Sequence, residues 1–312
     1  MKILIRSFLF GGMLLIGLTA VAKEPLRPPV YAIAHVRLCK SDPVRSVAFY
    51  QTTLGFLPVS QRAVNEKKRN AFWVNDVAQI DLECEQPQGA PLEIGFLTTD
   101  VAKMRKFLQS RGFHPSQIRT HWSSHAEFSM QDPEGHPIAF VQRPKVYFMD
   151  LNHDHRVSRN LIHAGFVVRN RAAEDHFYKD TLGFRLYWHG GMKDDEDRWV
   201  AMQVPDGTDW IEYMLNVPPD ASHHTLGVMN HISLGVEDIH AAENKLVANG
   251  WKPGEAPKIG RDGKWQLNLY DPDETRVEFM EFTPKERPCC SEFTGPHPGP
   301  QASSSPEPRL KR

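Results

Sequence analysis

An internal repeat constrains the fold of this chain more than any other feature of its sequence. Residues 35–56 match residues 163–184, and each segment runs from a histidine to a phenylalanine. The pattern Phe-Tyr-x-x-Thr-Leu-Gly-Phe starts at Phe49 and starts again at Phe177, 128 residues later. Such self-similarity indicates that one structural unit is used more than once, and that the core forms where copies of it pack together.

A second pair of segments repeats in the same way. Residues 93–113 parallel residues 231–251, and each has an apolar strand pattern, a helix-opening aspartate and a glycine before an aromatic residue. Turns that begin at Asp132-Pro133 and Asp271-Pro272 then separate two further strands. The chain therefore reads as four successive units of strand, helix and strands. Their approximate bounds are 31–86, 91–143, 160–216 and 227–283.

Short local signals place helices inside these units. Asp42 followed by Pro43 suits the N-cap and first helical positions. Gly55 and Gly183 close the two copies of the repeated pattern, where a helix commonly ends in a left-handed residue. We therefore predict that each leading strand is followed by a helix, and that these glycines end two of the helices.

Two histidine-bearing strands carry the strongest chemical signal. His163 and His231 each lie in a short apolar run. Glu212 follows His163 by 49 residues, and Glu278 follows His231 by 47 residues. A single histidine on a strand is more often a hydrogen-bonded core residue, but an unpaired buried carboxylate is costly. Two His–Glu pairs in repeated units therefore favour a shared ligand.

The N-terminus has the features of a signal peptide at residues 1–22. Lys2 and Arg6 precede an apolar run that ends in Ala20-Val21-Ala22, a small-residue cleavage site. The run is shorter than the roughly 20 residues that span a bilayer. We expect export to the periplasm or the medium, a mature chain that starts at Lys23, and no membrane contact after cleavage.

Length and charge limit the possible partners. The chain has 312 residues, enough for two domains that each bury a core. Its 37 lysines and arginines nearly balance its 38 aspartates and glutamates, for a formal net charge of −1. No basic field favours nucleic acid or a membrane surface. We expect a small-molecule substrate and a monomer or homodimer.

The remaining segments are a linker and a tail. Residues 144–159 are rich in charge and histidine and are predicted to link the two halves. Residues 284–312 are rich in proline, serine and glycine, so we expect this tail to be disordered or to pack as an extended arm. The tail holds Cys289 and Cys290, for which no third metal ligand is evident.

The other two cysteines lie on predicted strands. Cys39 has the strand parity of His35, whereas Cys84 has the opposite parity to Asp81. If His35 and Asp81 share one face of a sheet, Cys39 and Cys84 point to opposite faces. We therefore expect them to be poorly placed to form a disulfide.

The repeated FYxxTLGF pattern, together with NHISLGV and DPDETRVEF, resembles the vicinal oxygen chelate superfamily. That superfamily includes glyoxalase I, extradiol dioxygenases and bleomycin- and fosfomycin-resistance proteins. The resemblance covers about residues 31–283 and implies an α+β fold of four βαβββ units. Two units form each cupped mixed sheet. The implied domains are a first one at 31–143 and a second one at 160–283.

The resemblance also implies a metal site in the second domain, because the family carries ligands on the first and last strands of each unit. Carried over residue by residue, the ligands of one divalent ion are His163, Glu212, His231 and Glu278. Neutral imidazoles and carboxylates suit Fe²⁺, Mn²⁺, Ni²⁺ or Zn²⁺, so the sequence leaves the identity of the ion open.

The first domain departs from this ligand pattern. His35 is in register with His163, but Asp81 stands where the second domain has Glu212, Glu93 where it has His231, and Ala139 where it has Glu278. One ligand is lost outright. We therefore expect the first domain to keep a degenerate site and a mainly structural role.

The implied function is that of a metal-dependent enzyme that binds a substrate through two vicinal oxygens, with a leaning towards glyoxalase-like lyases or isomerases. Glu278 is the first choice for the proton-transferring carboxylate, and Glu212 is the second. One alternative is an extradiol-type dioxygenase, although Asn268 replaces its expected tyrosine and residues 260–262 lack its histidine. Export in turn disfavours a glutathione-dependent lyase. A non-catalytic protein that binds a small chelating ligand is a third possibility.

Overall fold

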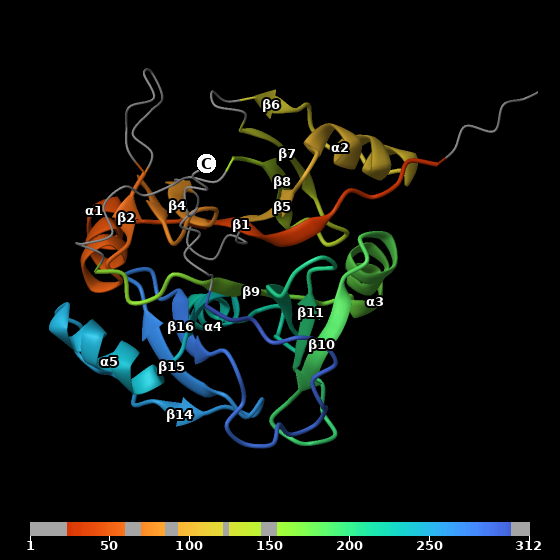
Figure 1. Cartoon of the computed structure of the whole chain (residues 1–312). Coiled ribbons are helices and arrows are strands. Elements are labelled where there is room, and N and C mark those ends of the chain that lie inside the picture. Colours follow the sequence, from red (N-terminus) through yellow and green to blue (C-terminus); the bar gives the residue numbers. More distant parts are fainter. Residues whose placement is uncertain (1–23, 60–69, 85–92, 121–124, 145–154, 301–312) are drawn as a thin grey trace, which may run out of the picture.

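A computed structural model describes residues 24–59, 70–84, 93–120, 125–144 and 155–300. The predicted signal peptide lies outside these residues. Two eight-stranded mixed sheets face each other, one built from the first half of the chain and one from the second (Figure 1). None of the helices in the described part combines the length and apolar character needed to cross a bilayer.

The first sheet has the strand order β2-β3-β4-β1-β5-β8-β7-β6. The central strands β1 and β5 are antiparallel, and each pairs in parallel with the last strand of its own unit, β4 or β8. Its strands are β1 (Val30–Cys39), β2 (Leu57–Pro58), β3 (Asn70–Trp73), β4 (Gln79–Cys84), β5 (Glu93–Thr98), β6 (Arg119–Thr120), β7 (Ala126–Gln131) and β8 (Pro137–Gln142).

The second sheet repeats this topology in the order β10-β11-β12-β9-β13-β16-β15-β14. Consecutive units therefore share a sheet, which confirms the predicted fold of four βαβββ units in two cupped sheets. Its strands are β9 (Leu161–Val167), β10 (Arg185–Gly190), β11 (Trp199–Gln203), β12 (Trp210–Met214), β13 (His231–Val236), β14 (Lys258–Ile259), β15 (Trp265–Tyr270) and β16 (Arg276–Glu281).

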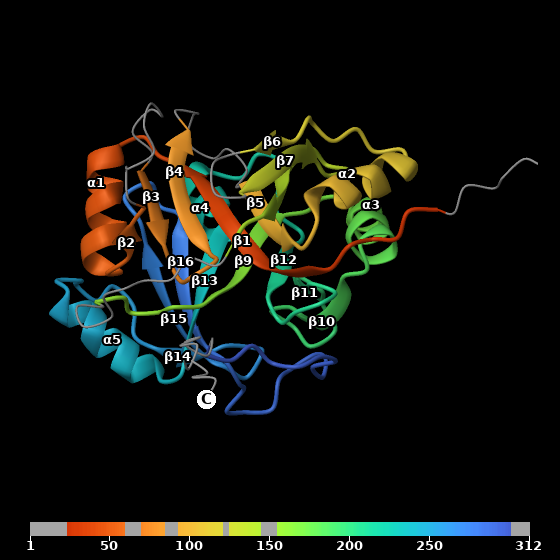
Figure 2. The same cartoon turned by 45° about the horizontal axis from the view of Figure 1, so that its top comes forward.

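Helices α1 and α5 lie at one side of the molecule and α2 and α3 at the opposite side, whereas α4 lies between these groups in this view (Figure 2). Asp42 caps α1 and Pro43 is its first residue, as predicted. Gly55 and Gly183 have φ values of +75° and +81°, which confirms the predicted left-handed ends. The helical segments are α1 (Pro43–Ala48), η1 (Phe49–Thr53), α2 (Val101–Ser110), α3 (Arg171–Glu174), η2 (Asp175–Thr181), α4 (His223–Met229) and α5 (Ile239–Ala248).

The repeated motifs join the two domains to each other. The Tyr50 hydroxyl donates a hydrogen bond to Asp271 Oδ2 at 2.8 Å, and the Tyr178 hydroxyl donates one to Asp132 Oδ2 at 3.3 Å. Each tyrosine belongs to the repeated Phe-Tyr pattern, and each aspartate opens the Asp-Pro turn of the other domain. Both tyrosines are completely buried in one apolar core to which both domains contribute.

The expectation for Cys39 is wrong, because this cysteine is disulfide-bonded. Strands β1 and β4 pair in register from His35 to Leu38, and a bulge then places Cys39 opposite Cys84. The extra residue lies in β4, between Leu82 and Cys84, and it reverses the alternation of faces beyond it. Parity counted along β4 from Asp81 therefore does not hold beyond Leu82.

Residues 284–300 pack as an extended arm, one of the two alternatives for the tail, and residues 301–312 lie outside the described residues. Lys285 N donates to Gly263 O, Cys289 N to Arg261 O and Thr294 N to Tyr187 O. A disulfide joins Cys289 to Cys290 within this arm. The arm thus connects the turn after β14 to strand β10, beside the cup of the second sheet.

Candidate metal centre

Four adjacent strands bring His163, Glu212, His231 and Glu278 to one face of the second sheet. Strands β9 and β13 at the centre carry the histidines, and their parallel neighbours β12 and β16 carry the glutamates. Paired residues in neighbouring strands point to the same face. Because Glu212 and His231 both pair with Gly165, their side chains share the face of His163.

The donor atoms of these residues lie close together. His163 Nε2 is 3.0 Å from His231 Nε2. Glu278 Oε2 lies 3.3 Å from His163 Nε2, and Glu212 Oε2 lies 3.3 Å from His231 Nε2. Each carboxylate therefore reaches past the neighbouring strand to the histidine beyond it. Single donor atoms of His163, Glu212 and His231 all lie within 4.8 Å of one another.

This geometry fits a divalent ion. Two nitrogen ligands at about 2.1 Å and at right angles are separated by about 3.0 Å, the distance between the two Nε2 atoms. His231 Nδ1 lies 2.9 Å from the carbonyl oxygen of Met229, so donation there leaves the Nε2 lone pair facing the centre. The ring of His163 packs 4.6 Å from that of Trp210, which fixes its orientation.

The protonation states also suit a cation. Burial raises the pKa of Glu278, but the hydrogen bond with His163 and the charge of Arg276 outweigh burial and lower the pKa to about 2. The pKa of Glu212 is lowered as well, because its hydrogen bond with His231 and the nearby histidines outweigh its burial. Burial and Arg276 lower the pKa of His231. Ionised carboxylates and neutral imidazole are the forms that bind metals.

Gly165 makes room for one of the histidines. A Cβ atom at Gly165 would lie 2.0 Å from Cε1 of His231, far inside contact distance. The imidazole therefore lies directly over the glycine backbone. Gly165 was not among the predicted site residues. The repeat aligns it with Arg37 of the first domain, and this replacement of an arginine by a glycine could have been noticed in the sequence.

The first-domain cup is filled by Arg37, which takes the position of Gly165. Its guanidinium donates a hydrogen bond to Glu93 and lies 3.9 Å from Asp81 Oδ2. Glu93 also contacts His35 Nε2 at 3.1 Å. His35, Asp81 and Glu93 stand at the positions of three ligands of the second domain, so a side-chain cation lies among them in the first domain.

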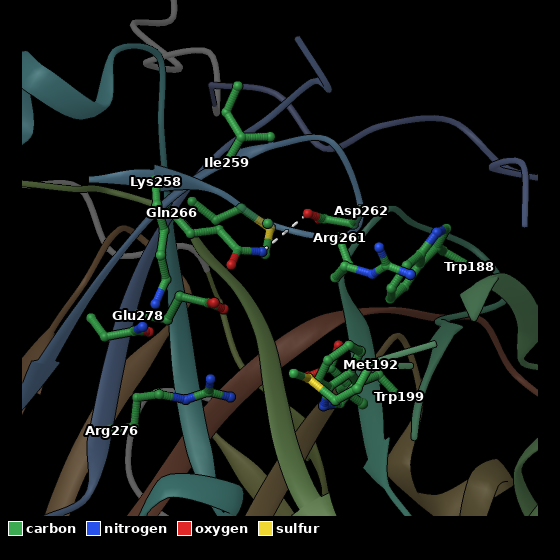
Figure 3. A pocket seen from close by; sticks show the side chains of 14 residues that line it. Trp188, Met192, Trp199, Lys258, Ile259, Arg261, Asp262, Gln266, Arg276 and Glu278 are labelled. Carbon is green, nitrogen blue, oxygen red and sulfur yellow. Dashed lines mark hydrogen bonds between the residues drawn. The ribbon is translucent and has the colours of Figure 1, made fainter. Parts of the chain in front are cut away.

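The second cup opens into a pocket of about 320 Å³ (Figure 3). Glu212 and Glu278 lie on its wall, and Asn268, paired with Glu278 in the sheet, lies beside them. The other lining residues are Trp188, Met192, Trp199, Lys258, Ile259, Gly260, Arg261, Asp262, Gln266, Arg276 and Met280.

A buried lysine that was not among the predicted site residues lies beside this cup. Lys264 is completely buried, and its Nζ lies 4.9 to 5.3 Å from the ring centres of Tyr187, Trp210 and Phe293. Burial lowers its pKa to about 8. Phe293 belongs to the arm, and Trp210 packs on His163. The cation–π contacts of Lys264 therefore connect the arm to a residue that packs on one of the two histidines of the site.

Two other clusters in the described part of the chain have metal-ligand chemistry. Asp132, His136 and Glu174 lie at the contact between the domains, and Asp194 lies beside Cys289 and Cys290. Burial raises the pKa of Glu174 to about 9, which disfavours its ionised form. Neither cluster lines the pocket of the second cup.

A family model described as the Glyoxalase/Bleomycin resistance protein/Dioxygenase superfamily matches residues 32–140 and 160–279. No curated protein sequence matches the chain. The two matched segments correspond to the two sheets, in agreement with the internal repeat.

Solved structures share the fold at low sequence identity. A single-residue variant of homoprotocatechuate 2,3-dioxygenase from B. fuscum has a TM-score of 0.61 and 16% identity, over 82% of this chain and 72% of that one. The Mn(II)-bound glyoxalase from Novosphingobium aromaticivorans has a TM-score of 0.60 and 17% identity, over 81% and 83%. The homoprotocatechuate 2,3-dioxygenase from Arthrobacter globiformis has a TM-score of 0.60 and 16% identity, over 82% and 80%.

Proposed function

Because this chain belongs to the Glyoxalase/Bleomycin resistance protein/Dioxygenase superfamily, we propose that it is a divalent-metal-dependent enzyme acting on a small substrate that binds through two vicinal oxygens. His163, Glu212, His231 and Glu278 hold the ion. The observation that carries this proposal is the pair of histidine Nε2 atoms 3.0 Å apart, each with a carboxylate oxygen at 3.3 Å, in the cup of a pocket. The Mn(II)-bound glyoxalase among the similar structures supports a divalent ion, whose identity stays open.

The protein side chains supply proton transfer and an apolar enclosure. A bound divalent ion provides Lewis-acid stabilisation of negative charge on substrate oxygens. Glu278 is the first candidate to take a proton from substrate, because it lines the pocket and is ionised at neutral pH. Glu212 is the second candidate, and its side chain is 14% exposed. Trp188 and Trp199 add apolar wall to the same pocket and exclude water from it.

A lyase or isomerase is the preferred reaction class. Two carboxylates face the pocket, and such groups suit proton transfer between neighbouring substrate carbons. Asn268 occupies the position where the dioxygenase pattern has a tyrosine, and it lines the pocket beside Glu278. An extradiol-type dioxygenase is the second candidate, favoured by the two-sheet build shared with the homoprotocatechuate 2,3-dioxygenases.

Metal content of untagged protein tests the site. We expect one ion per chain after reloading with Mn²⁺, Fe²⁺, Ni²⁺ or Zn²⁺, and loss of the ion in His163→Ala. The matched control is His35→Ala, the repeat counterpart in the first domain, which should keep the ion. Retention of a full complement of metal by His163→Ala would refute the site.

Turnover by the loaded protein separates the reaction classes. Oxygen uptake with catechols identifies a dioxygenase, whereas oxygen-independent conversion of hydroxycarbonyl compounds identifies a lyase or isomerase. Tight binding of chelating ligands without conversion in either assay identifies a binding protein instead of an enzyme.

Export belongs to the same proposal, and it rests on the charged start, apolar run and Ala20-Val21-Ala22 site of residues 1–22. Mass spectrometry of the native protein should find Lys23 as the first residue. Intact Met1 on protein from the cytosolic fraction would contradict it. Since glutathione is largely a cytosolic thiol, the substrate of an exported enzyme should not depend on it.

A further inference from the structure

Arg276 is a pocket cation that has no ion-pair partner among the residues that the structure describes. Its guanidinium has no carboxylate oxygen within 4.0 Å and no hydrogen bond to a side chain in those residues, and its Nε atom is buried and unsatisfied. Leaving a buried donor unsatisfied is costly, so a structure that keeps one at a pocket wall commonly reserves it for a ligand.

The two other cations that line the pocket are already neutralised. Lys258 Nζ lies 3.5 Å from a carboxylate oxygen of Glu255. Arg261 forms an ion pair with Asp194 and donates to the carbonyl oxygen of Gly191. Within the described part of the chain, Arg276 therefore differs from these neighbours in having hydrogen-bonding capacity left for a ligand.

Arg276 and Glu278 lie on the same face of β16, two residues apart, so their backbones are separated by about 6.6 Å. Figure 3 shows the guanidinium extending from the strand into the pocket, towards the side on which Met192 and Trp199 lie. The backbone separation is of the same order as the length of a six-membered ring with one substituent.

The charges around the site leave one positive charge for a ligand. A divalent ion would be neutralised by Glu212 and Glu278, and Arg276 then adds a full positive charge in a partly apolar pocket. Trp188, Trp199 and Met280 supply flat, apolar contact surface. A guanidinium binds carboxylate and phosphate groups through paired hydrogen bonds, which makes it selective for acids over neutral polar groups.

We infer that the substrate is an acid: a small, flat molecule whose vicinal oxygens face the His–Glu cluster and whose carboxylate or equivalent anionic group binds Arg276. This inference rests on the proposed function for the vicinal oxygens and adds the substrate class. It goes beyond the metal centre, because it depends on a side chain that is not one of the proposed ligands.

The test compares catechol with 2,3- and 3,4-dihydroxybenzoate, which offer the same pair of oxygens without and with a carboxylate. Binding to protein loaded with redox-inert Zn²⁺ is measured by calorimetry. We expect one of the two dihydroxybenzoates to bind about ten-fold or more tightly than catechol. Arg276→Gln should remove this preference, so that catechol and the preferred acid bind with about equal affinity, and Arg276→Lys should restore part of it.

Arg261→Gln is the matched control, because this arginine lines the same pocket but is paired with Asp194, and the preference should persist. Equal affinity of catechol and both acids, or equal weakening of all three by Arg276→Gln, overturns the inference and leaves the proposed function standing. Failure of all three to bind the loaded protein overturns the inference as well, whereas the metal content of His163→Ala tests the proposed function separately.

Discussion

At the scale of single residues, the second cup depends on side chains whose roles differ from those of their repeat counterparts. Glu278 has Ala139 as its counterpart, and Gly165 has Arg37. The first replacement removes a carboxylate from the first domain, and the second inserts a cation. The same backbone therefore presents an anionic, open cluster in one domain and a filled, charge-paired cluster in the other.

Glu278→Gln should lower the affinity for a divalent ion by about 100-fold and abolish turnover, because the amide keeps the shape but loses the charge and a basic oxygen. The melting temperature without metal should change little. Asp81→Asn, which alters the first-domain counterpart of Glu212, should leave metal content unchanged. If both variants retain full metal occupancy, or if Asp81→Asn alone loses it, the proposed site is misplaced.

Gly165→Ala should displace the His231 ring, because the added Cβ would lie 2.0 Å from Cε1 of that ring. Overpacking of this kind costs about 1–3 kcal/mol of folding stability, and metal affinity should fall with it. Gly254→Ala is the control, since no atom lies within 4 Å of a Cβ there. Thermal unfolding and metal titration of both variants test this prediction. Equal melting temperatures and equal metal affinities of the two variants would show that a glycine is not required at position 165.

At the scale of secondary-structure elements, the first cup shows how neighbouring strands can keep their arrangement without a bound metal ion. Arg37 on β1 contacts Glu93 on β5 and lies near Asp81 on β4, so one arginine ties three neighbouring strands together. An internal guanidinium thereby offsets the carboxylates that an ion would otherwise neutralise.

Arg37→Gly should destabilise the protein by about 1–3 kcal/mol, because the partly buried Glu93 and Asp81 lose a charged partner. It should also open a second site, in which His35, Asp81 and Glu93 bind a divalent ion. We expect added Zn²⁺ to restore the melting temperature and to raise the stoichiometry from one ion to two. An unchanged stoichiometry would mean that the first cup has lost metal binding altogether.

The reciprocal tyrosine contacts are a second feature at this scale. Tyr50→Phe should destabilise the protein by about 1–2 kcal/mol, because it removes a buried hydrogen bond of 2.8 Å to a carboxylate. Tyr178→Phe removes a bond of 3.3 Å to Asp132 and should have the smaller effect. Denaturant unfolding of both variants measures the difference. A larger loss of unfolding free energy in Tyr178→Phe would contradict the expected order of the two contacts.

At the scale of the whole molecule, one buried polar contact between the two domains is expected to respond to pH. Asp209 Oδ2 accepts a hydrogen bond of 2.9 Å from the backbone N–H of Ile33, across the domain boundary. Burial raises the pKa of Asp209 to about 7. Between about pH 4, the ordinary pKa of an aspartate, and pH 7, the folded protein therefore keeps a proton that the unfolded chain releases.

The sign of the pH dependence follows from linkage. A group that binds more protons in the folded state makes stability fall as pH rises, so the contribution of Asp209 should decrease from about pH 4 to pH 7 and then level off. Asp209→Asn keeps an acceptor oxygen without the charge. We expect it to raise stability at pH 8 by about 4 kcal/mol and to match the wild type at pH 4. Equal melting temperatures of the two proteins at pH 8 would contradict this assignment.

Much of the fold could be predicted from the chain alone, because its determinants are local or periodic. The Phe-Tyr repeat indicated duplicated units, and helix ends at Gly55 and Gly183 follow from the conformational freedom of glycine. The four His and Glu positions followed from family motifs carried over onto the repeated strands. The alternation of faces along a strand then specifies which side each residue occupies, independent of distant contacts.

The tertiary structure decided what depends on contacts between distant segments. The bulge in β4 brought Cys39 opposite Cys84 against the parity count, and the docking of residues 284–300 on β10 needed a surface built by other strands. The environments of two arginines also depend on packing. Arg37 fills the first cup, and Arg276 has an unsatisfied donor in the second. A sequence records the charge of an arginine, but only the folded chain determines whether a carboxylate comes within reach of it.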